Sequence, residues 1–425
     1  MTATRRIEPV EISPTSISNG GLDKLDPPEV VPGATAAAAS GAEHVEVGVA
    51  YDAILLASFG GPEGQDDVIP FLRNVTRGRG IPEERLEEVA HHYRAFGGVS
   101  PINDQNRELK AALEAELARR GIDLPVLWGN RNWDPYLRDA LTEAHERGFT
   151  KLIAVGTSAY SSYSSCRQYR EDYAIALEET GLGGVIQIDK VRQFFDHPGF
   201  VEPFIEGVRQ GLVDAAAAGI PPEQTHVLFA THSIPTADAE KSGPAGNAYQ
   251  AQHLAVAEVV MAAQEVARIE PVEISPTSDA GEVSTISTRL SWDLVYQSRS
   301  GPPTQPWLEP DINDRIVELA GQGVKAVIIV PLGFISDHME VKWDLDTEAI
   351  ETEEHGIFAV RVPTPGVHAA FVSGLVDLVL ERRDGIPTAD RPALTELGPW
   401  FDVCRPGCCE NVRLGFKPAL AGIAP

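Results

Sequence analysis

Short apolar runs recur along the chain from Tyr51 onward, and amphipathic segments with helical spacing separate them. An apolar run of this length that ends in glycine or polar residues predicts a buried β-strand. Segments such as QNRELKAALEAELARRG and YLRDALTEAHERG predict helices between the strands. The predicted strands lie in YDAILLASFGG, LPVLWGN, KLIAVGTSAY, VIQIDKV, HVLFATHS, WDLVYQS, KAVIIVPLGF and IFAVRVP.

Strands that alternate with helices predict parallel sheets and doubly wound α/β domains. The number of strands suits two such sheets better than one. In open sheets of this kind, ligands bind beyond the carboxyl ends of the strands, so the residues after each run are candidates for a site. No G-x-G-x-x-G follows the first run and no Walker loop is present, so the sequence does not support a dinucleotide or a nucleoside triphosphate.

The residues before the first run have a different composition. Residues 1–50 are rich in Pro, Gly, Ser, Thr and Ala without a sustained period, so we expect them to be disordered. The segment RIEPVEISPTS occurs at Arg6–Ser16 and again at Arg268–Ser278. The second copy begins a polar stretch, 267–288, that we interpret as a flexible insert. A duplicated linker is the simpler interpretation of the repeat, and a docking motif is the alternative.

Charge and composition narrow the classes of function. The chain has 425 residues, of which 43% are hydrophobic, and a net charge of −27, which disfavours nucleic acid and favours a cation as partner. No apolar run reaches the roughly 20 residues of a membrane-spanning helix. The start of the chain has no secretory pattern, and four cysteines do not make a disulfide scaffold, so we expect a cytoplasmic protein.

His232 follows the apolar run HVLFAT, at a predicted strand end. An imidazole at the mouth of a cleft can accept a proton or bind a metal near neutral pH. A hydrogen-bonded structural histidine is the alternative at this position.

A row of acidic residues follows the strand that ends at Gly333. A helix is expected to begin near Ser336, and helical spacing then places four carboxylates on one of its faces. A divalent cation would compensate the repulsion between them, and oxygen ligands suit such ions. A solvated acidic face is the alternative. The four residues are Asp337, Glu340, Asp344 and Glu348.

Two further segments indicate binding of an aromatic anion. Thr157–Asp172 follows a strand and is dense in hydroxyls and aromatic rings, which suits a flat ligand, although it can equally be a plain serine-rich loop. Arg73, Arg77 and Arg79 stand together in an otherwise acidic protein, and arginine favours carboxylates.

Three of the four cysteines lie within the segment CRPGCCENVR near the end of the chain. Four thiolates suit a 2Fe–2S centre or zinc. The spacing C-x₃-C-C lacks the C-x₂-C pair of common zinc sites, which weakens zinc without excluding it.

Several long motifs together resemble the ferrochelatase family: SFGGPEG, FLRNVTRGRG, FGGVSPIN, FATHSIP, SRSGPPTQPWLEPD and PLGFISDHMEVKWDLDTE. They occur in order over Tyr51–Arg383, and the resemblance is greatest to actinobacterial members that act on coproporphyrin III. It implies two Rossmann-like domains with a porphyrin cleft between them. The implied parts are 51–195 and 196–365, a helix at about 366–384 that packs back on the first domain, and a tail at 385–425.

The resemblance also implies roles for individual residues. His232 and Glu340 match the catalytic inner Fe²⁺ site, and Asp344 and Glu348 match outer metal or relay positions. The implied porphyrin contacts are Ser100, Tyr169, Arg77 and Phe59. Some relatives have a tyrosine that ligates iron at the position of Phe59, and phenylalanine cannot do so.

For the cysteines, the resemblance implies a 2Fe–2S cofactor held by Cys166, Cys404, Cys408 and Cys409. The insert 267–288 is not a feature of the family.

The expected function is insertion of Fe²⁺ into coproporphyrin III to give coprohaem in haem biosynthesis, with transient contact with other haem-pathway enzymes as a further expectation. The alternatives are a protoporphyrin IX ferrochelatase, a cobalt or nickel chelatase of the same fold, and a non-catalytic tetrapyrrole or metal carrier. Which of His232 and Glu340 accepts a proton is left open by the sequence.

Overall fold

The computed structural model describes most of the chain and places eight strands in it. The predictions for residues 1–47, for 270–288 and for nearly all of the second RIEPVEISPTS copy lie outside the described residues. One boundary of the predicted insert is wrong, because helix α8 (Ala248–Ile269) continues through its first three residues. The described residues are 48–269, 290–300, 304–351, 356–411 and 417–422.

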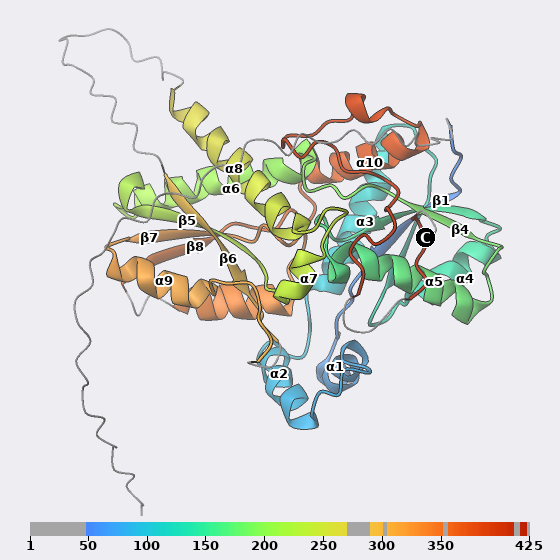
Figure 1. The fold of residues 1–425 in the computed structure, drawn as a ribbon, viewed down its shortest axis with the longest axis horizontal. Coiled ribbons are helices and arrows are strands. Elements are labelled where there is room, and N and C mark those ends of the chain that lie inside the picture. The colour runs from blue at the N-terminus through green and yellow to red at the C-terminus, as the bar shows by residue number, and fades with distance from the viewer. Residues whose placement is uncertain (1–47, 270–289, 301–303, 352–355, 412–416, 423–425) are drawn as a thin grey trace, which may run out of the picture. The chain divides into compact units, whose positions relative to one another are not determined.

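Each of the eight predicted runs contains one strand, and all neighbouring strands are parallel, as expected. The strands form two four-stranded sheets with the same order relative to the sequence, in which the first strand of each sheet lies beside its second and third (Figure 1). The first sheet is β2 (Val126–Asn130), β1 (Ala53–Ser58), β3 (Lys151–Gly156) and β4 (Gln187–Lys190), and the second is β6 (Ser291–Gln297), β5 (Thr225–His232), β7 (Ala326–Val330) and β8 (Phe358–Arg361).

Helices cover both faces of each sheet, because successive side chains on a strand point to opposite faces. Leu56 of β1 and Phe229 of β5 belong to one large core that both sheets share. Leu55 and Leu228, the preceding residues on these strands, face two separate cores on the opposite sides. The helices that contribute to the shared core are α3 (Ile102–Arg119), α6 (Pro198–Ala217), α8 and α10 (Ala369–Arg383). The opposite face of the first sheet is covered by α4 (Leu137–Glu146) and α5 (Gln168–Thr180). The opposite face of the second sheet is covered by α9 (Ile312–Gly321) (Figure 1).

Two helices near the beginning of the described chain stand apart from the sheets (Figure 1). They are α1 (Val68–Val75) and α2 (Glu83–Ala95), and their apolar sides form a small core of their own. The remaining short elements are α7 (Thr236–Glu240), 3₁₀ turns at Gln65–Asp67, Pro222–Gln224 and Thr388–Asp390, and π-helices at Tyr163–Arg167 and Val341–Ala349.

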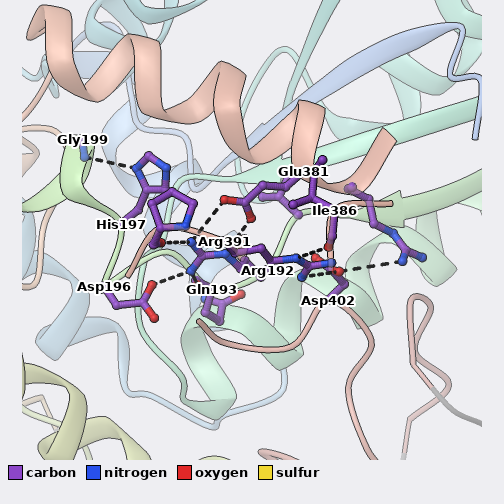
Figure 2. A network of polar contacts seen from close by, with 12 residues as sticks. Arg192, Gln193, Asp196, His197, Gly199, Glu381, Ile386, Arg391 and Asp402 are labelled. Atoms are coloured by element: carbon purple, nitrogen blue, oxygen red, sulfur yellow. Dashed lines mark hydrogen bonds and ion pairs between the residues drawn. The ribbon is translucent and has the colours of Figure 1, made fainter. Parts of the chain in front are cut away.

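A buried ionic network fastens the segment after β4 to α10 and to the tail (Figure 2). The Arg192 side chain is fully buried and bonds Glu381 of α10 at 2.8 Å and Asp196 at 2.5 Å. It also donates to the Pro392 carbonyl at 2.8 Å, and Arg391 pairs with Asp402 at 2.7 Å. The network therefore joins segments that are up to 200 residues apart in the sequence.

None of the helices in the described residues is long and apolar enough to cross a membrane. The cytoplasmic location stays a prediction.

Candidate functional site

His232 is the last residue of β5, so the sheet holds its backbone at a carboxyl edge. The Tyr249 hydroxyl donates to the His232 carbonyl at 2.9 Å, which fixes the peptide further. The imidazole Nδ1 bonds the carbonyl oxygen of Ser233. A carbonyl accepts only, so Nδ1 carries a hydrogen and Nε2 of the neutral ring is left free.

Glu340 lies directly opposite that free nitrogen. Its Oε2 is 3.6 Å from His232 Nε2 and 3.8 Å from His338 Nδ1. The His232 and Glu340 side chains are 32% and 46% exposed, so a metal ion can reach the pair from solvent. His338 was missed by the sequence analysis, although it stands two residues before Glu340 in the quoted motif FISDHMEVKW.

Charged neighbours shift the pKa values of His232 and Glu340 in opposite directions. Burial tends to lower the pKa of His232, but the Glu340 carboxylate outweighs it and leaves this pKa above its ordinary value. Burial tends to raise the pKa of Glu340, but His232 and His338 outweigh it and lower this pKa to about 2. Near neutral pH the glutamate is therefore an anion that faces a comparatively basic imidazole.

Asp344 has the opposite environment. Its pKa is raised to about 7, mainly by burial and in part by the carboxylates of Glu340 and Glu348, despite a hydrogen bond from the Ser298 hydroxyl. A carboxyl group with this pKa can gain or lose a proton under physiological conditions.

The helix that carries these acids differs from the prediction. Helical structure begins at Met339, not near Ser336, and continues as a π-helix through Val341–Ala349. Asp337 precedes the helix, and its carboxylate bonds Arg361 at 3.1 Å and Thr364 at 3.0 Å. The prediction of four carboxylates on one helical face is therefore wrong for Asp337, because this residue lies before the helix and is paired with Arg361.

Helix α2 packs across the π-helix. The rings of His92 and Trp343 stack with centroids 4.1 Å apart and planes 5° apart. The indole of Trp343 donates to Glu348 at 2.8 Å. Burial raises the pKa of Tyr93, also on α2, and the charges of Glu340 and Asp344 add to this effect. The acidic residues thus lie against an aromatic surface that the sequence analysis did not identify.

The predicted porphyrin contacts differ in their exposure to solvent. Phe59 is 37% exposed, and the Arg131 guanidinium lies 5.7 Å from its ring centroid. The same guanidinium lies 4.7 Å from the Tyr169 ring, but Tyr169 is only 6% exposed and belongs to the core between α5 and the first sheet. Arg131 was not predicted from the sequence.

The other two predicted contacts are Ser100 and Arg77. Ser100 is buried, and its backbone N–H donates to the Pro62 carbonyl at 2.9 Å, in the loop that follows Phe59. Arg77 is exposed and bonds the side chain of Asn74 at 2.5 Å. The porphyrin-binding role of these residues stays a prediction.

The four cysteines do come together. Cys166, on the short π-helix before α5, lies with its Sγ 3.8 Å from that of Cys409, which is 3.9 Å from the Sγ of Cys408. All four side chains are buried free thiols and form a cluster of their own beside Phe401. The Gly243 N–H donates to Cys409 Sγ at 3.0 Å. The structure thus brings the tail to the serine-rich segment.

As they stand, these side chains are not a formed metal centre. In the described part of the chain, no group of three or more His, Cys, Asp or Glu side chains is arranged to hold a metal ion.

Open parallel α/β sheets bind their ligands beyond the carboxyl ends of the strands, and the His232–Glu340 pair lies at such an edge. The family model described as Ferrochelatase matches residues 51–383. The chain therefore belongs to the ferrochelatase family, and the resemblance noted in its motifs is confirmed.

Individual relatives have more specific names. The coproporphyrin III ferrochelatase of Leifsonia xyli subsp. xyli is 71% identical over 92% of this chain and 100% of its own length. That of Tropheryma whipplei (strain Twist) is 56% identical over 88% of this chain and 93% of its own. That of Streptomyces griseus subsp. griseus is 50% identical, with 88% and 96% covered.

Proposed function

We propose that this protein inserts Fe²⁺ into coproporphyrin III, with release of two protons and no change in the oxidation state of the iron. The observation that carries the proposal is the His232–Glu340 pair, 3.6 Å apart at the carboxyl edge of the second sheet. Membership of the ferrochelatase family and three relatives named coproporphyrin III ferrochelatase support the choice of metal and porphyrin.

The two residues divide the work by their proton affinities. Glu340 stays ionised near neutral pH, since its pKa is about 2, and so attracts and orients the incoming Fe²⁺. His232 has a free Nε2 and a raised pKa, which suits it to accept a proton from a pyrrole nitrogen. The bound cation would then favour loss of that proton from the imidazole.

Asp344 is the candidate for the next proton position. Its pKa of about 7 lets it take a proton near neutral pH, and the charges of Glu340 and Glu348 on either side favour its protonated form. Glu348 accepts a hydrogen bond from the Trp343 indole at 2.8 Å. It is exposed and is the outermost of the acids Glu340, Asp344 and Glu348, which suits it to capture the metal ion.

Anaerobic assays with Fe²⁺ test this function. We expect repeated turnover with coproporphyrin III and a lower kcat/KM with protoporphyrin IX. Equal or higher efficiency with protoporphyrin IX would assign that porphyrin as the substrate. Faster insertion of Co²⁺ or Ni²⁺ would assign that metal in place of iron. Quenching of porphyrin fluorescence that stops at one equivalent would show a carrier in place of an enzyme.

We further propose that Cys166, Cys404, Cys408 and Cys409 hold a 2Fe–2S cluster. Four buried thiols without disulfide bonds are the donor set of such a cluster, and two of the sulfur–sulfur distances, 3.8 and 3.9 Å, suit thiolates on a shared centre. The N–H of Gly243 bonds one sulfur, as is usual around these clusters. Iron and inorganic sulfide in anaerobically purified protein test the assignment, and one equivalent of zinc without sulfide would replace it with a zinc site.

A further inference from the structure

Two buried cations stand next to the cysteine cluster. Lys190 ends β4 and is 7% exposed, and Arg170 lies on α5 and is 3% exposed. The Lys190 ammonium donates to the Val191 carbonyl at 3.1 Å. Arg170 Nε donates to the Leu420 carbonyl at 2.5 Å, whereas its Nη1 has no hydrogen-bond partner. Neither side chain is in an ion pair with a carboxylate of the described residues.

Such an arrangement is costly unless a negative charge lies nearby. A buried charge without a counter-charge destabilises a folded protein by several kcal/mol. Four neutral thiols supply no charge. No carboxylate of the described residues compensates Lys190 and Arg170, and the cysteines are the acidic groups beside them.

The geometry places the cysteines beside both cations. Lys190, Arg170 and Cys166 line one common cavity. We therefore place the compensating charge on the cysteine sulfurs or on a group that they hold.

We propose that Lys190 and Arg170 are the counter-ions of the 2Fe–2S cluster and set its reduction potential. This inference rests on the cluster assignment proposed above. An oxidised 2Fe–2S centre with four thiolates has two net negative charges, which two cations balance. Reduction adds one more negative charge, so nearby cations favour the reduced form and raise the potential.

Lys190 is the better residue to change, because Arg170 also holds the tail: its backbone carbonyl accepts from Leu420 N–H at 3.1 Å. The test is a redox titration, followed by electron paramagnetic resonance, of the anaerobic full-length protein. Lys190→Met removes the charge and keeps the length of the side chain, and Lys190→Arg keeps the charge. Lys325→Met, at an exposed lysine beside the second sheet, controls for loss of any positive charge.

We expect Lys190→Met to shift the midpoint potential to more negative values by at least about 59 mV, which is a tenfold change in a one-electron equilibrium. Loss of the cluster in Lys190→Met alone, with native circular dichroism, would also support a counter-ion. Lys190→Arg and Lys325→Met should keep the wild-type potential.

An unchanged potential in Lys190→Met would overturn the counter-ion role, as would loss of the cluster in both Lys190 variants, which would indicate packing in place of charge. Wild-type protein without inorganic sulfide would instead overturn the cluster assignment itself.

Discussion

At the scale of single residues, the site depends on how its neighbours separate the proton affinities of His232, Glu340 and Asp344. The Ser233 carbonyl fixes which imidazole nitrogen faces Glu340. The charges of His232 and His338 keep Glu340 ionised, while burial raises the pKa of Asp344 to about 7. Each of the three can be tested separately.

We expect His232→Ala to reduce kcat for iron insertion by about 10²–10⁴-fold, because a proton acceptor at the pyrrole nitrogens is lost. Circular dichroism should be unchanged, since the side chain is 32% exposed. His145→Ala, at an exposed histidine of α4, is the control and should keep full activity. Activity above a tenth of wild type in His232→Ala would exclude this role.

Glu340→Gln should be similarly severe, because the amide removes the negative charge opposite His232 without a change of size. Glu348→Gln should mainly raise the apparent KM for Fe²⁺ and leave kcat within about threefold, since this residue is the outermost of the three acids. Steady-state kinetics at varied Fe²⁺ measure both. A normal kcat in Glu340→Gln together with a normal KM in Glu348→Gln would mean that these acids form only a solvated face.

Asp344→Asn should stabilise the protein at pH 8 but not at pH 4. The pKa of Asp344 is raised from 3.8 to about 7. Between these values the folded protein holds a proton that the unfolded chain has released, so the free energy of unfolding falls as pH rises and stays reduced above pH 7. Asparagine does not ionise and so avoids this loss. The resulting gain in the free energy of unfolding at pH 8 is at most about 4 kcal/mol, because each pKa unit corresponds to about 1.36 kcal/mol. Urea unfolding at both pH values measures it, and an equal gain at both would show that Asp344 does not titrate in this range.

At the scale of elements, two π-helical segments and the tail place the functional groups. One π-helix carries Asp344, and the other carries Cys166. π-Helical turns are uncommon and concentrate at functional sites. The tail reaches the second of them through the Arg167 side chain, which donates to the Lys417 carbonyl at 2.9 Å. A β-bridge between Cys404 and Gly422 joins two parts of the tail itself.

Cys404→Ser should abolish the 2Fe–2S absorption and lower the melting temperature, because three thiolates do not complete both irons and the tail loses a crosslink to the segment before α5. Iron insertion should fall with stability, not before it, since the reaction needs no electron from the cluster. The control is Ser164→Ala, an exposed neighbour of Cys166. A colourless Cys404→Ser protein with wild-type melting temperature would contradict a structural role.

At the scale of the whole molecule, the shared core joins the two sheets, and the Arg192 network fastens the segment after β4 to α10 and to the tail. Breaking a buried ion pair by removal of one partner costs about 3–5 kcal/mol. Arg192 has two carboxylate partners, and all three side chains are nearly inaccessible to solvent. The network therefore contributes to the stability of the molecule as a whole.

Arg192→Met should lower the free energy of unfolding by about 3–5 kcal/mol, because Asp196 and Glu381 are left buried without their cation. Arg85→Met provides a matched comparison, since the Arg85–Glu88 pair is exposed and should contribute at most about 1 kcal/mol. Chemical unfolding, monitored by tryptophan fluorescence, measures both. Equal effects would mean that water penetrates the network.

The sequence by itself determined the strands, their parallel arrangement and the family. Each strand is a short apolar run between polar turns, and this pattern is local, so it can be read without the fold. His232 and Glu340 were also identifiable, because they follow strand ends and stand in long motifs.

Only the tertiary structure decided which of the other predicted residues meet. The partner that neutralises Asp337, Arg361, is 24 residues away. The ring of Tyr169 lies in the core between α5 and the first sheet, although its segment reads as a polar loop in the sequence. The π-helical turn, the stack of His92 on Trp343 and the two cations beside Cys166 likewise depend on contacts between distant segments. Hydrophobic periodicity records which side of an element is buried, but not what it is buried against, and charge compensation depends on the latter.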